Sequence, residues 1–435
     1  MTTRQNPASR PAFQLNNTTS SPAYTGYYCW GGPGTIRMIG VKEFAPRIDE
    51  HSLLTCYDYD YVARVQELFG VTDYWVMYSW GFADATEAED RRFIAERIDN
   101  FKRLGIRVHG YIQGPNLVYD EFPQVDWWAR DHRHRRITYY RGRHMCSIHH
   151  EGYAQYVLNK IRGTYDLGFD GIFVDNIQHG QLGVPAAEGR MPFVFCGDYS
   201  PAARAAFRAE TGQDIPTDLE LDPDLTRLYL DFRARANEAF IGRLAEATHE
   251  GGMVFGTNFY DPKFHSLYTY GIDLKRMSDL QDYVLFENHS LPRHDGKRHN
   301  GYIEDIVAQH DIDKPVFLVS YENGVGMAPQ FRQEQIDNLF SEAARSRFHL
   351  CLKGSEFTTK GVWHCLYLDD ITPPAREKVL PRQANVADTK RLETLLALWP
   401  LRQIIKRYYN PITTMVFEWR IFRVMLKVIY DLAIK

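Results

Sequence analysis

The chain has 435 residues, of which 44% are hydrophobic, so it can form a large core and a disordered protein is excluded. Its 51 Lys and Arg nearly balance its 55 Asp and Glu, and the net charge of −4 gives no general electrostatic reason to bind nucleic acid. The six cysteines form no CxxC pair and are too few for a disulfide framework, and no apolar run is long enough to span a bilayer.

Residues 1–23 are predicted to form a disordered N-terminal tail, because they are rich in Thr, Ser, Asn, Pro and Gln. The segment contains no apolar stretch of the kind found in secretory signals. We therefore expect a cytoplasmic protein.

Residues 24–386 alternate short apolar runs with helical segments, which predicts a (β/α)8 TIM barrel. The runs are apolar throughout, as is typical of parallel strands covered on both faces. An open doubly wound sheet is the alternative, and it is less favoured because no GxGxxG follows the first strand. The first strand is Tyr27–Trp30 or Ile36–Val41, and the other seven are Tyr74–Tyr78, Ile106–Ile112, Gly171–Val174, Met253–Gly256, Tyr283–Phe286, Pro315–Val319 and Phe348–Leu352.

Helices are predicted between these strands from the spacing of apolar residues. Glu87–Leu104 and Glu151–Leu167 both repeat apolar residues with a period near 3.6. An insertion, residues 177–223, follows the fourth strand, and Ser200–Pro201 within it has the pattern of a helix start. A long helix is expected over residues 224–250.

Residues 387–435 are predicted to form a basic, amphipathic helical extension. From Lys390 to Lys435 there are nine basic and three acidic residues. This extension could pack on the barrel or on a partner subunit, or it could contact an anionic membrane surface. Within Ile412–Lys435, the charged residues of one helical face are Arg420, Arg423, Lys427 and Asp431.

Three predicted strands end in a carboxylate, and in a barrel the carboxyl ends of the strands face one shared cleft. Asp175 ends the fourth strand and could act as a nucleophile, as a base or as an electrostatic partner of the transition state. Glu287 ends the sixth, where burial would raise its pKa and suit it to general acid catalysis. Glu322 ends the seventh and is the third candidate. The structural alternatives are that Asp175 caps the following loop and that Glu287 forms a salt bridge with a loop arginine.

Polar and aromatic residues at or near the other strand ends could bind a polyhydroxylated ligand. Each of them alone is more often structural, and only their convergence on one cleft favours a binding site. The candidate substrate-binding residues are Trp30, Trp80, His109, Tyr111, Gln113, Asn176, Asn258, His289 and Tyr321.

Other chemistries have weaker support. We predict no metal and no cofactor, because the third strand offers only His109 where a metallohydrolase barrel would carry an HxH pair. The basic segment Arg130–Arg143 could meet an anionic substrate group, but a solvated loop is favoured. A lyase or aldolase would favour a lysine at a strand end, and Lys353 is the only candidate.

The stretch LGFDGIFVDNI, Leu167–Ile177, resembles the fourth-strand signature of many (β/α)8-barrel glycoside hydrolases. The stretch Phe195–Gln213 is similar to a segment of β-galactosidase-like and uncharacterised bacterial hydrolases, although only Cys196 of their Cys-rich loop is present, so we predict no structural zinc. Asp175–Asn176 in place of an Asn-Glu pair is closer to α-galactosidase-like and polygalactosaminidase-like enzymes. This resemblance implies Asp175 as nucleophile and Glu287 as acid/base, and Glu322 is the alternative partner.

Three hypotheses follow. The first is a glycoside hydrolase or transglycosidase that uses Asp175 and Glu287 on an oligo- or polysaccharide, with Trp30, Trp80 and Tyr111 stacking on sugar rings. The second is a non-catalytic glycan-binding barrel involved in polysaccharide assembly. The third is a barrel enzyme of another class, such as a lyase.

Overall fold

The computed structural model describes most of the region in which the barrel is predicted. The described residues are 24–42, 50–140, 142–183, 194, 196–262, 265–288, 291, 300–320, 331–346, 348–358, 361–364, 371–374, 394 and 397–418. The predicted disordered tail, residues 1–23, lies outside these ranges.

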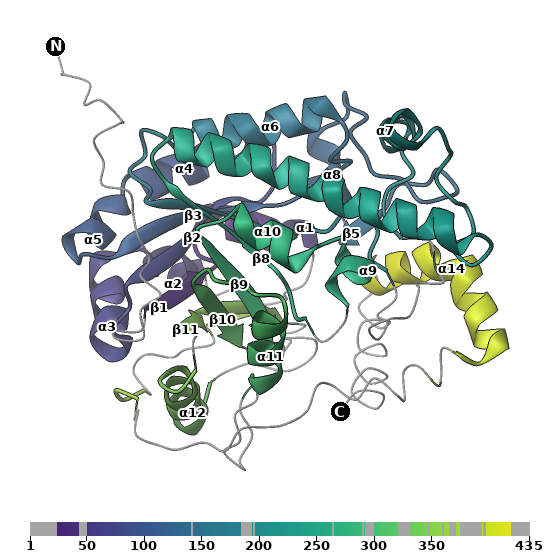
Figure 1. Cartoon of the computed structure of the whole chain (residues 1–435). Helices are drawn as coiled ribbons and strands as arrows, with labels where there is room; N and C mark the ends of the chain where they lie inside the picture. The colour runs from purple at the N-terminus through teal and green to yellow at the C-terminus, as the bar shows by residue number, and fades with distance from the viewer. Residues whose placement is uncertain are drawn as a thin grey trace.

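Eight parallel strands form a closed barrel, which confirms the predicted TIM-barrel fold (Figure 1). The order around the barrel is β1-β11-β10-β9-β8-β7-β3-β2. Nearly every strand residue is buried, as expected for strands between a filled interior and an outer layer of helices. The strands are β1 Thr25–Cys29, β2 Asp73–Ser79, β3 Arg107–Gln113, β7 Gly171–Asp175, β8 Val254–Asn258, β9 Tyr283–Asn288, β10 Val316–Ser320 and β11 His349–Lys353.

The first strand is β1, so Tyr27–Trp30 is close to correct and the alternative Ile36–Val41 is wrong. Ile36–Val41 lies inside helix α1, Pro33–Lys42, which begins with a proline at a position where the missing N–H costs nothing. The short run of apolar residues is compatible with a strand or with a helix, and the helix start at Pro33 decides for the helix.

Helices surround the barrel (Figure 1). The predicted helix Glu87–Leu104 is two helices, α4 Ala88–Ala95 and α5 Ile98–Arg103, because the chain turns at Glu96 and Arg97. Ser200 caps α7 as predicted, since its side chain accepts a hydrogen bond from the Ala203 N–H. The other helices of the barrel and its insertion are α2 Glu50–Thr55, α3 Tyr59–Phe69, α4 Ala88–Ala95, α5 Ile98–Arg103, α6 Glu151–Arg162, α7 Pro201–Thr211, α8 Pro223–Glu250, α9 Ser266–Tyr270, α10 Leu274–Asp279, α11 Gly301–Gln309 and α12 Gln333–Ala343.

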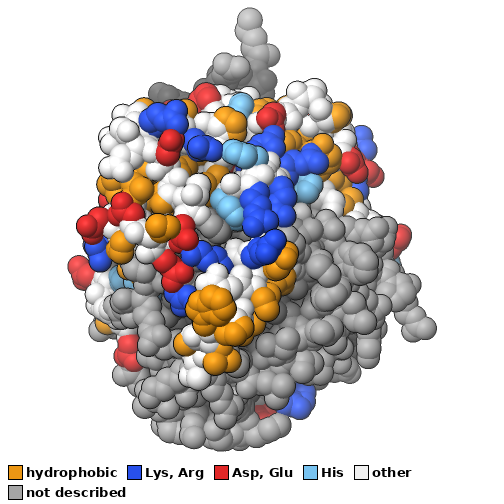
Figure 2. All heavy atoms as spheres, turned by 90° about the vertical axis from the view of Figure 1, so that its right-hand side faces the viewer, with side chains coloured by type: hydrophobic (Ala, Val, Ile, Leu, Met, Phe, Trp, Pro, Cys, Tyr) orange, Lys and Arg blue, Asp and Glu red, His pale blue; other side chains and the backbone are white. Residues whose placement is uncertain are grey.

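The basic segment Arg130–Arg143 is not simply the solvated loop that the sequence favoured. Together with the preceding residues it builds a three-stranded antiparallel sheet, β4 Asn116–Val118, β5 Thr138–Tyr140 and β6 Arg143–Met145, and Arg143 is fully buried. A small apolar cluster of Ala129, Ile137 and Met145 holds the segment in place. Exposed basic side chains remain at Arg133 and Arg135, and Figure 2 shows Lys, Arg and His side chains gathered on one face of the molecule.

Helix α14, Trp399–Glu418, is the described part of the predicted extension. It contacts the insertion through Lys406, which lies 2.7 Å from Asp218, and through Ile405 and Tyr409, which pack on Val194. The predicted charged face beyond residue 418 lies outside the described residues. Within the described part of the chain, no helix is both long and apolar enough to cross a membrane.

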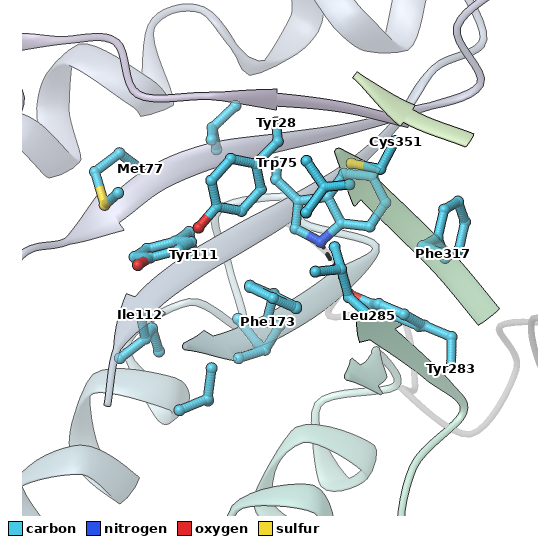
Figure 3. Close-up of a cluster of buried hydrophobic side chains, with 14 of the residues drawn as sticks. Tyr28, Trp75, Met77, Tyr111, Ile112, Phe173, Tyr283, Leu285, Phe317 and Cys351 are labelled. Atoms are coloured by element: carbon cyan, nitrogen blue, oxygen red, sulfur yellow. Dashed lines mark hydrogen bonds between the residues drawn. The ribbon is translucent and has the colours of Figure 1, made fainter. Parts of the chain in front are cut away.

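Large aromatic side chains fill the barrel interior (Figure 3). Trp75 stacks on His109 with ring centroids 4.7 Å apart, and its Nε1 donates to the hydroxyl of Tyr283 at 3.2 Å. Gly26 makes room for Trp75, because a Cβ on Gly26 would lie 2.3 Å from the indole ring. Interior glycines thus allow aromatic side chains larger than the usual branched aliphatic ones.

Candidate active site

Asp175, Glu287 and Lys353 lie at one level near the carboxyl ends of the strands. In an eight-stranded barrel, the four side chains of a layer come from every second strand. The residue that belongs to the layer on the next such strand lies two positions further towards the carboxyl end than the residue reached by following the hydrogen-bonded register. The registers obey this rule around the whole barrel: from Asp175 to Glu287, then to Lys353, to Met77 and back to Asp175. We call these four residues the carboxylate layer.

Hydrogen-bond donors surround the Asp175 carboxylate, which is only 5% exposed. Its Oδ1 accepts from the Asn176 N–H at 2.8 Å and from Asn258 Nδ2 at 2.7 Å. Its Oδ2 accepts from Asn176 Nδ2 at 2.8 Å and from the Tyr111 hydroxyl. Each oxygen therefore has two donors, and this arrangement fixes the carboxylate and stabilises its charge.

Burial raises the pKa of Asp175 above its usual range, and the neighbouring Glu287 carboxylate raises it further. The hydrogen bonds from Tyr111 and Asn258 oppose this rise. Glu287 itself is 8% exposed and extends from β9 in the same layer. The sequence placed these two acids more than a hundred residues apart, and the barrel brings them into electrostatic contact.

The raised pKa of Asp175 predicts a pH-dependent effect on stability. The folded state binds this proton more readily than the unfolded state, so the free energy of unfolding falls as the pH rises above about 3.8 towards the raised pKa. Asp175→Asn removes this loss, and thermal unfolding should show the variant gaining stability relative to the wild type as the pH rises above about 3.8. Glu151→Gln is a control for which the dependence of stability on pH has the opposite sign, because hydrogen bonding to Arg243 lowers the pKa of Glu151 to about 2. A pH-independent difference for Asp175→Asn would contradict the prediction.

Aromatic residues form one wall of the mouth. Tyr28 and Tyr111 lie edge to face with centroids 5.6 Å apart, in the layer directly beneath Asp175 and Glu287. Trp30 follows β1 and is half-buried above them, and its role in ligand binding stays a prediction. Trp80 is only 2% exposed and donates from Nε1 to Thr35 at 3.1 Å, so it supports Trp30 from behind rather than offering a free face.

Gln113 and Asn176 also lie at the mouth, as predicted. Gln113 pairs in register with Asp175, and its buried Nε2 has no hydrogen-bond partner among the described residues. Asn176 has a left-handed backbone with φ of 57° and accepts from the hydroxyl of Tyr139. Strained backbone of this kind is concentrated at functional sites.

Two residues at the mouth were missed by the sequence reasoning. Tyr139 belongs to the basic segment that was expected to be solvated, and its aromatic character next to Tyr140 was the only available signal. Tyr260 follows Asn258 by two residues, has φ of 58° and stacks on Tyr270 at 4.4 Å. The alternation of strand residues beyond Asn258 could have identified Tyr260.

His109 was expected in the cleft, and this expectation is wrong. Its side chain lies on the same face of β3 as Tyr111 but further into the barrel, beneath Trp75. There its Nε2 lies 2.9 Å from Asp73 Oδ1 and its Nδ1 lies 3.3 Å from the hydroxyl of Tyr283. His109 is a core residue, because every second residue of a barrel strand points inward and only the last ones reach the mouth.

Three predicted site residues, His289, Tyr321 and Glu322, lie outside the described residues. Asp170 lies at the opposite end of β7, where its carboxylate accepts from the Val108 N–H at 2.8 Å. In the described part of the chain, no three His, Cys, Asp or Glu side chains group in a way that could hold a metal ion.

No family model and no curated protein sequence matches the chain. Among solved structures, it is similar to a β-galactosidase from Halorubrum lacusprofundi, with a TM-score of 0.50 and 13% identity over 76% of this chain and 52% of that chain. The shared feature is the fold. The chain spans about half the length of this enzyme and of the β-galactosidase from Marinomonas ef1, which has a TM-score of 0.48 and 13% identity over 76% of this chain and 53% of that chain. The match with Ega3 of Aspergillus fumigatus, solved with galactosamine, covers 68% of this chain and 88% of the Ega3 chain, with 13% identity and a TM-score of 0.37.

Proposed function

We propose that this protein is a glycoside hydrolase that cleaves an oligo- or polysaccharide with Asp175 and Glu287 as its two carboxyl groups. The single observation on which the proposal rests is that these two acids share one layer at the mouth of a closed barrel. Hydrolysis of a glycosidic bond requires such a pair, one group to transfer a proton and one to stabilise or attack the anomeric carbon.

The hydrogen bonds of Asp175 favour the nucleophile role for this residue. Four donors stabilise its ionised form, and an attacking carboxylate must be ionised. Glu287 donates a proton to the glycosidic oxygen as that oxygen leaves C1, and an Asp175 oxygen forms a bond to C1. Glu287 then takes a proton from water, the water oxygen bonds to C1, and the bond to Asp175 breaks.

The burial of the two acids favours an enzyme over a purely glycan-binding barrel. Two carboxylates that repel each other in a buried site destabilise the fold, and sugar binding alone does not need this arrangement. Catalysis gives a reason for it, since cleavage of a glycosidic bond needs two carboxyl groups at the same bond.

The direct test is hydrolysis of a broad panel of aryl glycosides and polysaccharides by the full chain. We expect release of the aryl group from at least one glycoside, with a reducing sugar as the second product. Binding on a glycan array without turnover of any panel member would instead favour the glycan-binding hypothesis.

Trp30→Ala should weaken substrate binding. Trp30 is the half-buried aromatic residue above Glu287 and Asp175, and stacking of a sugar on its ring would contribute about 1 kcal/mol. We expect KM to rise by about 5-fold, as steady-state kinetics at a fixed pH would show. Trp30→Phe is the matched control and should keep most of the affinity, whereas an unchanged KM for the alanine variant would remove Trp30 from the binding site.

A further inference from the structure

Lys353 is the third charged member of the carboxylate layer. It is the last residue of β11, and its register with Tyr28 places it in the same layer as Asp175 and Glu287. Its side chain is fully buried, with 0% exposure. The layer therefore contains two carboxylates, one ammonium group and the uncharged Met77.

Aromatic rings surround the ammonium group on one side. Lys353 Nζ lies 4.0 Å from the ring centroid of Trp30 and 5.1 Å from that of Tyr28. Contact with two ring faces favours the positively charged form of a lysine. The rings alone compensate only part of the several kcal/mol lost when an ammonium group leaves water, so an anion is expected nearby.

The order of the strands identifies that anion. Glu287 on β9 and Lys353 on β11 are neighbours in the layer, separated only by β10. Asp175 on β7 lies across the barrel from Lys353 and already has four hydrogen-bond donors. Asp175 is therefore held by its donors, and Glu287 is the carboxylate that neighbours Lys353 in the layer.

We propose that Lys353 is the electrostatic partner of Glu287 and sets the pH at which the carboxyl pair gives up its proton. This inference rests on the proposed function, in which Glu287 transfers that proton. Burial and mutual repulsion make a carboxyl pair hold its proton to high pH, and a neighbouring ammonium group opposes both effects. Lys353 thus tunes the pair towards the pH at which a proton can be both given and taken.

Among the residues that the structure describes, the other groups that face this site do not compete for the proton near neutral pH. Val319 of β10, Asn258 of β8 and Met77 of β2 are uncharged. The remaining titratable groups are hydroxyls and one thiol, and burial is the first cause that raises the pKa of each of them well above its usual range. Among the described residues they are Tyr28 of β1, Tyr111 of β3, Tyr139 of β5, Cys351 of β11 and Tyr260, whose pKa is also raised first by burial.

The test compares Lys353→Met, which keeps the length of the side chain but removes the charge, with Lys353→Arg, which keeps the charge. In the pH profile of kcat/KM on an aryl glycoside, the alkaline limb should move up by about one pH unit or more in the methionine variant. The arginine variant should stay near the wild type. An unmoved alkaline limb, or an effect of Lys353→Met on KM alone, would overturn the proposal. So would a covalent adduct on Lys353 after borohydride reduction with substrate, because that would make Lys353 a Schiff-base nucleophile.

A second measurement does not depend on activity. Carbon-13 NMR titration of the carboxyl groups, with Glu287→Gln used to assign the Glu287 resonance, should give a higher titration midpoint in Lys353→Met than in the wild type. Lys353→Gln serves in the same titration if the methionine variant does not fold. Equal midpoints would refute the pairing of Lys353 with Glu287 even if the enzyme is active. A shifted midpoint in a protein that cleaves no glycoside would support the pairing while rejecting the proposed function.

Discussion

Asp175→Asn and Glu287→Gln should each lower kcat/KM on the best glycoside substrate by about 1000-fold, because each removes a group that acts on the reacting bond. Both substitutions keep the shape of the side chain, so the fold should persist. The two variants should also differ from each other. Glu287→Gln should retain more activity on glycosides with a good leaving group, since departure of such a group needs no proton.

Asp90→Asn is the matched control for these two variants. Asp90 is also a buried carboxylate, 4% exposed, but it lies on α4 outside the barrel and pairs with Arg37 at 2.8 Å. Its loss should affect stability and leave kcat/KM near the wild-type value. Full activity in Asp175→Asn or in Glu287→Gln would show that the affected acid has no part in catalysis.

Gly26→Ala should destabilise the protein, by up to about 3 kcal/mol. The new Cβ would lie 2.3 Å from the indole of Trp75, which is fully buried between His109 and Phe317 and cannot move away. Chemical denaturation should show a lower midpoint, and less of the variant should be recovered as folded protein at 37 °C than of the wild type.

Gly40→Ala provides the comparison for the effect of a methyl group alone. Gly40 lies in the exposed part of α1, and a Cβ there would meet nothing within 4 Å. Its replacement should stabilise the helix by about 0.5–1 kcal/mol. If both glycine variants had the same stability, close packing around Trp75 would not be the reason for Gly26.

The strands could be predicted because each is an uninterrupted apolar run between polar loops, and a strand buried on both faces needs no other signal. The segment Arg130–Arg143 shows where this reasoning fails. Its charge density indicated a loop, but only a few apolar residues, Ile137 and Met145 among them, are needed to anchor a short sheet. The break between α4 and α5 was missed for a related reason. The apolar residues keep their helical spacing across the turn, so their pattern does not show that one helix ends and another begins.

For the site, the sequence identified which residues lie at strand ends, but it did not show how deep in the barrel each side chain lies. Asp175 and Glu287 were selected because a carboxylate follows an apolar run, and Asn258 and Tyr111 because they are polar groups on neighbouring strands. His109 satisfied the same criterion and proved to be a core residue paired with Asp73. Lys353 was considered only for lyase chemistry, although it occupies the same layer as the two acids.

The sequence by itself determined the closed barrel and the two acids at its carboxyl end, because hydrophobic patterning and strand-end position are local properties of the chain. Only the tertiary structure decided which side chains share a level. That depends on the tilt of the strands and the stagger of their registers, which arise when the eighth strand, β11, closes on the first. The stagger brings Lys353 into the same layer as Glu287 and places His109 beneath Trp75.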